Sequence, residues 1–75
     1  MDIKDFISNF AQQFDDPEEM NLAPDTEFKK LPEWGSLTAL SVICMIDDEY
    51  GKTINGETIR EANTIQDLFN KIFNA

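Results

Sequence analysis

The apolar residues recur at steps of three and four along three segments, and this spacing constrains the fold more than any other feature. An α-helix turns about every 3.6 residues, so such steps place the apolar side chains on one face of a helix. The pattern predicts helices over residues 2–14 and 36–50, and a third helix that begins at Thr64. No comparable run of period two predicts a sheet, and the expected fold class is all-α.

The first predicted helix has a single apolar stripe and a clear end. Asp2 and Asp5 form a plausible capping pair at its start, and Asp15-Asp16-Pro17 is expected to end it near Asp15. The stripe consists of Ile3, Phe6, Ile7, Phe10 and Phe14.

Residues 15–35 form a long connection that holds all three prolines and has no sustained period. Connections of this length are uncommon in small domains unless they are functional or packed against the core. Four apolar residues are expected to pin it to the core: Leu22, Phe28, Leu31 and Trp34.

The second predicted helix carries two stripes, whereas a small domain usually buries only one face of a helix. We expect the broader stripe to face the core; it consists of Ala39, Val42, Ile43, Ile46 and Tyr50. The narrower stripe is a candidate docking surface for a protein partner, made of Leu37, Leu40 and Cys44 with Asp48 in line and Asp47 beside it. An alternative is that the long connection covers this narrower stripe.

Gly51 is expected to end the second helix, and the segment after it allows two interpretations. Asn55-Gly56 is a hairpin signal, but the flanking arms are short. We therefore favour a loop that carries Ile54 into the core, followed by a short helical turn over residues 57–61. Thr64 and Asp67 then predict a capped last helix, whose stripe is Ile65, Leu68, Phe69 and Ile72. The chain is thus expected to form one domain over residues 1–75, a small four-helix bundle with three longer helices, one short helix and a long first loop.

The charge excludes several classes of function. Fifteen acidic residues stand against six basic ones, giving a formal charge of −9. Phosphate would repel such a chain, so neither nucleic acid nor an anionic membrane surface is an expected partner. No apolar run is long enough for a membrane span, and the residues after Met1 do not read as a signal peptide, so a cytoplasmic location is expected.

The chain also lacks the usual residues of catalytic and metal sites. It contains no histidine, and Cys44 is its one cysteine, so zinc sites, an internal disulfide and Ser/Cys–His catalysis are not expected. The consecutive acids Asp47, Asp48 and Glu49 point to different sides of a helix and cannot converge on a metal. We therefore expect a protein that is not an enzyme.

Ser36 stands out by its position at the start of the second predicted helix, directly after Gly35. Free backbone N–H groups and the helix dipole favour an anion there. A serine at this place would also serve as a helix N-cap for purely structural reasons, and the position alone favours this second interpretation.

The order of residues over nearly the entire chain resembles the acyl carrier protein family. The resemblance is carried by Phe28, Trp34-Gly35-Ser36-Leu37, Leu40, Val42, Ile43, Ile46, Asp47-Asp48-Glu49-Tyr50-Gly51, Ile54 and Thr64-Ile65-Gln66-Asp67-Leu68. It implies that Ser36 receives a 4′-phosphopantetheine arm from coenzyme A, and that the terminal thiol of the arm carries acyl groups as thioesters. The family fold is a four-helix bundle with a long first loop.

The resemblance also implies partners and an acyl-chain cavity. A monomeric, non-catalytic carrier would meet a phosphopantetheinyl transferase and acyl-processing enzymes with basic docking patches through Leu37, Leu40, Cys44, Asp47 and Asp48. The acyl chain would enter the core beneath Phe28, Val42, Ile43, Ile46, Ile54, Ile59 and Ile65.

The chain departs from the family pattern at the site itself. Gly35 replaces the usual aspartate, Thr38 and Ser41 stand where acids are common, and residues 31–34 differ. Two alternatives therefore accompany a role in fatty-acid or related acyl assembly. One is a specialised aminoacyl or polyketide carrier, and the other is an unmodified helical adaptor in which Ser36 is only a helix cap.

Overall fold

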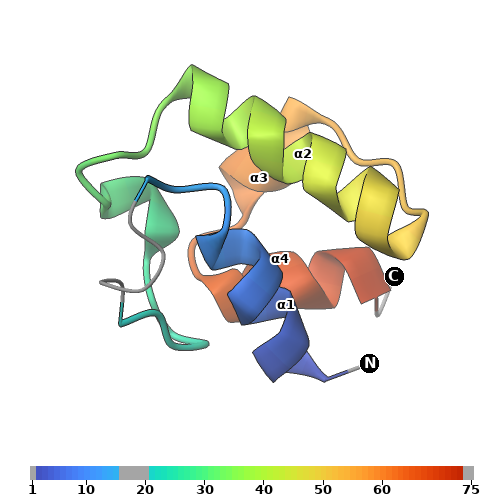
Figure 1. Cartoon of the computed structure of the whole chain (residues 1–75), viewed down its shortest axis with the longest axis horizontal. Helices are drawn as coiled ribbons and strands as arrows, with labels where there is room; N and C mark the ends of the chain where they lie inside the picture. The colour runs from blue at the N-terminus through green and yellow to red at the C-terminus, as the bar shows by residue number, and fades with distance from the viewer. Residues whose placement is uncertain (1, 16–20, 74–75) are drawn as a thin grey trace.

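The structure is a computed structural model that describes residues 2–15 and 21–73 (Figure 1). These residues form four α-helices and one 3₁₀ turn, and they contain no strand, as the all-helical prediction requires. Helix α1 packs on α4 and α2, while the short α3 packs on α2 and α4. The bounds are α1 Ile3–Ala11, η2 Phe28–Lys30, α2 Ser36–Tyr50, α3 Gly56–Glu61 and α4 Ile65–Phe73.

Helix α1 ends at Ala11, and the expectation that it would continue to near Asp15 is wrong. After Ala11 the chain tightens into turns, because the N–H of Gln13 donates to the Phe10 carbonyl at 3.1 Å. The side chain of Gln13 donates instead to the Asn9 carbonyl, which this tightening leaves without a helical donor. Phe14 nevertheless stays buried. At the other end, Asp2 is the N-cap and its carboxylate accepts from the N–H of Lys4.

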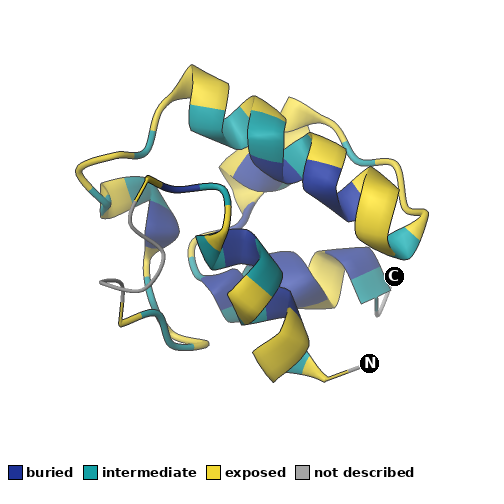
Figure 2. Ribbon diagram, in the orientation of Figure 1, coloured by how far each residue is buried: buried dark blue, intermediate teal, exposed yellow. Residues whose placement is uncertain are grey.

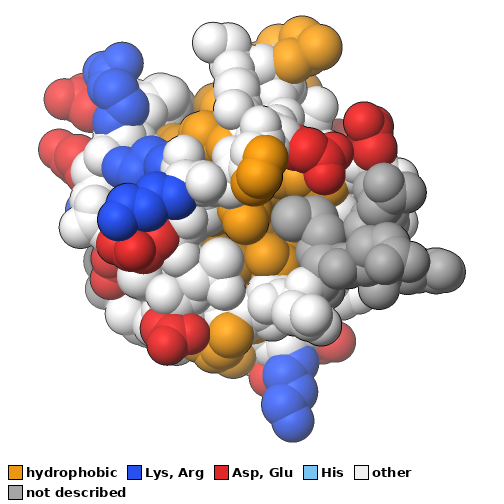
Figure 3. Space-filling model, turned by 90° about the vertical axis from the view of Figure 1, so that its left-hand side faces the viewer, with side chains coloured by type: hydrophobic (Ala, Val, Ile, Leu, Met, Phe, Trp, Pro, Cys, Tyr) orange, Lys and Arg blue, Asp and Glu red, His pale blue; other side chains and the backbone are white. Residues whose placement is uncertain are grey.

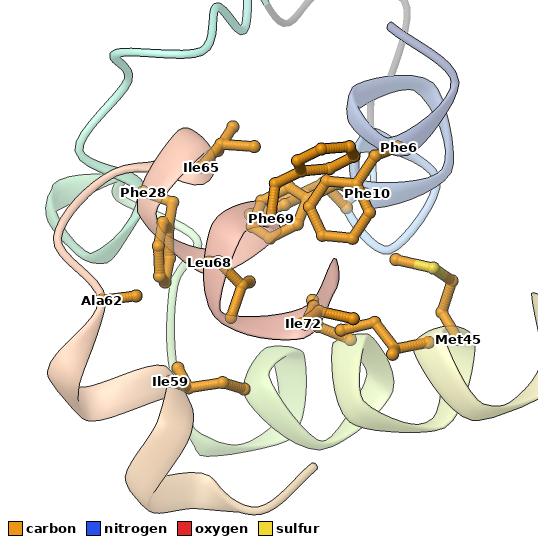
Figure 4. Close-up of a cluster of buried hydrophobic side chains, with 13 residues drawn as sticks. Phe6, Phe10, Phe28, Met45, Ile59, Ala62, Ile65, Leu68, Phe69 and Ile72 are labelled. Atoms are coloured by element: carbon orange, nitrogen blue, oxygen red, sulfur yellow. The ribbon is translucent and has the colours of Figure 1, made fainter. Parts of the chain in front are cut away.

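Buried apolar side chains from the four helices, η2 and the adjoining turns meet in one core between the helices (Figures 2 and 4). Aromatic rings make up much of it, and Phe6 contacts the ring of Phe69 at a centroid distance of 5.5 Å. The buried residues are Phe6, Phe10, Phe14, Phe28, Val42, Met45, Ile46, Ile59, Ala62, Ile65, Leu68, Phe69 and Ile72.

Helix α2 buries the face that the sequence predicts, with one addition. Val42 and Ile46 are buried, and the other residues of the broader stripe are partly buried against the same core. Met45 is also buried, although it lies between the two stripes; it extends toward α1 and the end of α4 (Figure 4). Gly51 ends the helix in the left-handed conformation, at φ 64°, as predicted.

The described part of the long connection is fixed to the start of α4 and to the core. The backbone N–H groups of Ile65 and Gln66 donate to the carbonyls of Thr26 and Pro24, at 3.1 and 2.8 Å. Phe28 is fully buried, and the other three predicted anchors, Leu22, Leu31 and Trp34, pack against the core. The predicted packing of this segment is confirmed, while Pro17 lies outside the described residues.

The Asn55-Gly56 pair starts a helix and does not turn a hairpin. The Asn55 carboxamide oxygen accepts from the N–H of Thr58 at 3.1 Å, which makes Asn55 the N-cap of α3. The short helix begins one residue before the predicted turn, and Ile54 packs against the core as expected.

Helix α4 begins with the reciprocal cap that the sequence predicts. The N–H of Asp67 donates to the Thr64 hydroxyl at 3.1 Å, and the Asp67 carboxylate accepts from the N–H of Thr64 at 3.2 Å. Replacing Thr64 with alanine is therefore expected to lower the free energy of unfolding by about 1 kcal/mol. Urea denaturation followed by circular dichroism measures this, with Thr53→Ala in an exposed loop as the control. Equal midpoints for the two variants would contradict a stabilising cap.

Candidate functional site

Ser36 is the first residue of α2, and Gly35 is the N-cap. The interpretation of Ser36 as the helix cap is therefore wrong. Gly35 has no side chain to accept a hydrogen bond. The Thr38 hydroxyl instead donates to the Glu33 carbonyl at 2.9 Å, which links the first turn of α2 to the segment before it. Ser36 is exposed, and no hydrogen bond to its hydroxyl is found among the described residues. The hydroxyl is thus available for chemistry.

Ser36 lies at the edge of an open groove of about 580 Å³ between α2, α3 and η2. The walls are mainly apolar, and two basic residues, one from η2 and one from α3, also line them. Figure 3 shows this side of the molecule, where basic side chains lie beside a group of apolar ones. The lining residues are Lys29, Trp34, Gly35, Ser36, Ala39, Leu40, Ile43, Gly56, Ile59 and Arg60.

The residues predicted to surround an acyl chain occupy two different environments. Phe28, Val42, Ile46 and Ile65 have no exposed surface and form a closed core, while Ile54 is partly buried. Ile43 and Ile59 also line the groove next to Ser36. The structure therefore brings two of the seven residues together with Ser36 and places the others elsewhere in the core cluster.

The groove contains residues that the sequence analysis did not select for a site. Lys29 and Arg60 are separated by 31 positions, yet the ammonium of Lys29 donates to the Arg60 carbonyl at 2.7 Å. No local pattern links these two residues. Trp34 was expected only as a core anchor, and it also forms a wall of the groove.

The narrower stripe of α2 is open. Leu37 is 80% exposed and Leu40 is 56% exposed, and Cys44, Asp47 and Asp48 are exposed as well. The described residues of the long connection therefore do not cover this stripe, while residues 16–20 of that connection lie outside the described part of the chain. A second depression runs along it, lined by four of the five predicted docking residues (Leu37, Leu40, Cys44 and Asp48) together with Gln13, Ser41, Met45 and Glu49.

No group of three or more His, Cys, Asp or Glu side chains in the described part of the chain could hold a metal ion. Within residues 2–15 and 21–73, none of the helices has the length and apolar character needed to cross a membrane.

A scan against protein-family models gave no match, and searches of the curated proteins and of the solved structures gave none either. The acyl carrier resemblance is therefore an expectation from the residues.

Proposed function

We propose that this chain is an acyl carrier protein that bears a 4′-phosphopantetheine arm on Ser36. It carries acyl groups as thioesters on the arm's thiol for fatty-acid or related acyl assembly, and it catalyses no step itself. The observation that carries the proposal is the hydroxyl of Ser36, an exposed residue that lines a mainly apolar groove and whose hydroxyl has no hydrogen-bond partner among the described residues.

The electrostatics at the start of α2 support an attached phosphodiester. The N–H groups of Ser36 and Leu37 precede the first backbone hydrogen bond of the helix, which joins Ala39 to the Gly35 carbonyl at 2.9 Å. These free donors and the helix dipole favour a negative charge. The first turn of α2 contains no acidic residue, so no carboxylate there repels the phosphodiester.

The exposed stripe of α2 supports reversible docking to partner enzymes. Leu37 and Leu40 offer apolar contact close to Ser36, and Asp47 and Asp48 lie further along the same helix. Opposite charges on a partner raise the rate of encounter more than the lifetime of the complex, which suits a carrier that visits several enzymes in turn.

Replacing Leu40 with aspartate is expected to lower the transferase's kcat/KM for this chain about 10- to 30-fold, since an exposed apolar contact becomes a buried charge in the complex. The measurement is the initial rate of arm transfer at varied carrier concentration. Thr53→Asp adds the same charge at an exposed position in the loop between α2 and α3, and it should keep the parental rate. Equal losses in both variants would show that added charge matters and that this surface does not.

The proposal is tested by incubating the purified chain with coenzyme A and a phosphopantetheinyl transferase. The expected product is heavier by one phosphopantetheine group and reacts with thiol reagents at one additional sulfur. Cleavage after Lys30 and Lys52 releases one peptide that contains Ser36, Thr38 and Ser41, and its fragmentation assigns the modified hydroxyl. Absence of any mass gain with several transferases would overturn the proposal.

The exposure of Leu37 and Leu40 also favours a second candidate, an unmodified helical adaptor that binds a protein through this stripe. The two candidates differ in their need for the hydroxyl. If Ser36→Ala keeps the native function while Leu40→Asp destroys it, the adaptor explains the chain; if Ser36→Ala destroys the function, the carrier does.

A further inference from the structure

The groove beside Ser36 concentrates positive charge on a strongly acidic chain. The sequence has six basic residues against fifteen acidic ones, and two of the six, Lys29 and Arg60, line this groove. Lys30 pairs with Glu27 at 3.2 Å and Lys71 pairs with Glu61 at 3.7 Å. In the described part of the chain, neither Lys29 nor Arg60 has a carboxylate within ion-pair distance. These two groove-lining cations therefore have no counter-ion from the described residues.

A hydrogen bond to the backbone holds the Lys29 ammonium beside α3. The Lys29 ammonium donates to the Arg60 carbonyl at 2.7 Å, so the bond joins η2 to α3 at the groove. Lys29 is partly buried, which restricts its side chain more than that of a fully exposed lysine. The ammonium keeps two further N–H donors for a ligand.

The rest of the groove suits an apolar chain. The indole ring of Trp34 is held by the core, because it stacks on Phe10 at an interplanar angle of 5° and meets the edge of Phe28 at a centroid distance of 4.9 Å. This rigid ring and the side chains of Ile43 and Ile59 form the apolar walls. A ligand that matches the groove combines a hydrocarbon chain with an anionic group.

We propose that this groove binds an alkyl chain that ends in an anion, with the anion against Lys29 and Arg60 and the chain along Trp34, Ile43 and Ile59. The binding is non-covalent and needs no modification of Ser36. Two sources could supply such an anion: the carboxylate of a free ligand, or the phosphodiester of an arm attached to Ser36. The unmodified protein has no arm, so binding to it tests the free carboxylate alone.

The test uses the unmodified chain and three probes: octanoate, octanol and acetate. Trp34 is the one tryptophan, so its fluorescence reports on the groove, and calorimetry measures the affinity independently. Octanoate should bind roughly tenfold more tightly than octanol, the size expected for two exposed charge pairs, and acetate should not bind measurably. Added salt should weaken octanoate binding and leave octanol binding unchanged. Equal affinities for octanoate and octanol would overturn the proposal.

Variants assign the effect to the two cations. Lys29→Gln combined with Arg60→Gln should bring octanoate to the affinity of octanol. Lys52→Gln, which removes one positive charge outside the groove, is the control for each single variant and should change little. Arg60→Gln alone keeps the hydrogen bond from Lys29 to the backbone carbonyl of residue 60, so α3 should stay in place. An intermediate loss of octanoate affinity in this variant would therefore come from the lost charge and not from a displaced helix. Parental octanoate binding by the double variant would overturn the proposal. Ser36→Ala should bind octanoate as the parent does, so failure of arm transfer and failure of this proposal are distinguishable.

Discussion

Replacing Ser36 with alanine is expected to abolish transfer of the phosphopantetheine arm completely, because no other hydroxyl occupies the same place at the start of α2. The same change should alter the free energy of unfolding by less than about 0.5 kcal/mol. Gly35 is the N-cap, and the Ser36 hydroxyl has no hydrogen bond among the described residues, so alanine removes none of them. Intact-mass spectrometry after incubation with coenzyme A measures the first effect, and urea denaturation measures the second.

Ser41 provides the matched control, since it lies on the same helix but lines the second depression and not the groove. Ser41→Ala should still gain the mass of one arm, since it keeps the Ser36 hydroxyl. An arm on Ser36→Ala, or a large loss of stability in that variant, would contradict the assignment of Ser36 as a hydroxyl without a structural role.

Replacing Ile46 with alanine is expected to lower the free energy of unfolding by about 2–5 kcal/mol. Ile46 has no exposed surface and lies in the centre of the buried face of α2, where truncation leaves a cavity that neighbouring helices cannot fill fully. A loss of this size is a large part of the total stability of a small domain, and the variant is expected to be partly unfolded at physiological temperature. Urea denaturation at low temperature gives the difference.

Leu40→Ala is the matched control for Ile46→Ala, because it removes an aliphatic side chain from the exposed side of the same helix. Its free energy of unfolding should stay within about 0.5 kcal/mol of the parent. If Leu40→Ala proves the more destabilising of the two, the assignment of the two faces of α2 is wrong.

The parts of the fold that the sequence predicts well depend on neighbours in the chain. The reciprocal cap of Thr64 and Asp67 joins residues three positions apart, and the buried stripes of α1, α2 and α4 follow from helical spacing. These features need no knowledge of the tertiary contacts. The end of α1 is different, because two tight turns at Gln13 and Phe14 replace a further turn of the helix. The ring of Phe14 packs against Trp34, which lies far along the chain, so local spacing does not predict where the helix ends.

The candidate site shows the same division between local and distant contacts. The position of Ser36 at the start of a helix can be predicted from its neighbours, and so can the apolar stripe formed by Leu37 and Leu40. The groove cannot be predicted in this way, since it forms only when η2, α2 and α3 assemble. Lys29 and Arg60 carry no local signal of their proximity, and their convergence depends on the fold.

The most direct test of the central claim is the intact mass of this protein purified from the cells that produce it. The proposed function predicts that some or all of the molecules exceed the mass of the polypeptide by one phosphopantetheine group on Ser36, with or without an acyl group on its thiol. A polypeptide that remains unmodified at Ser36 under every growth condition would contradict it.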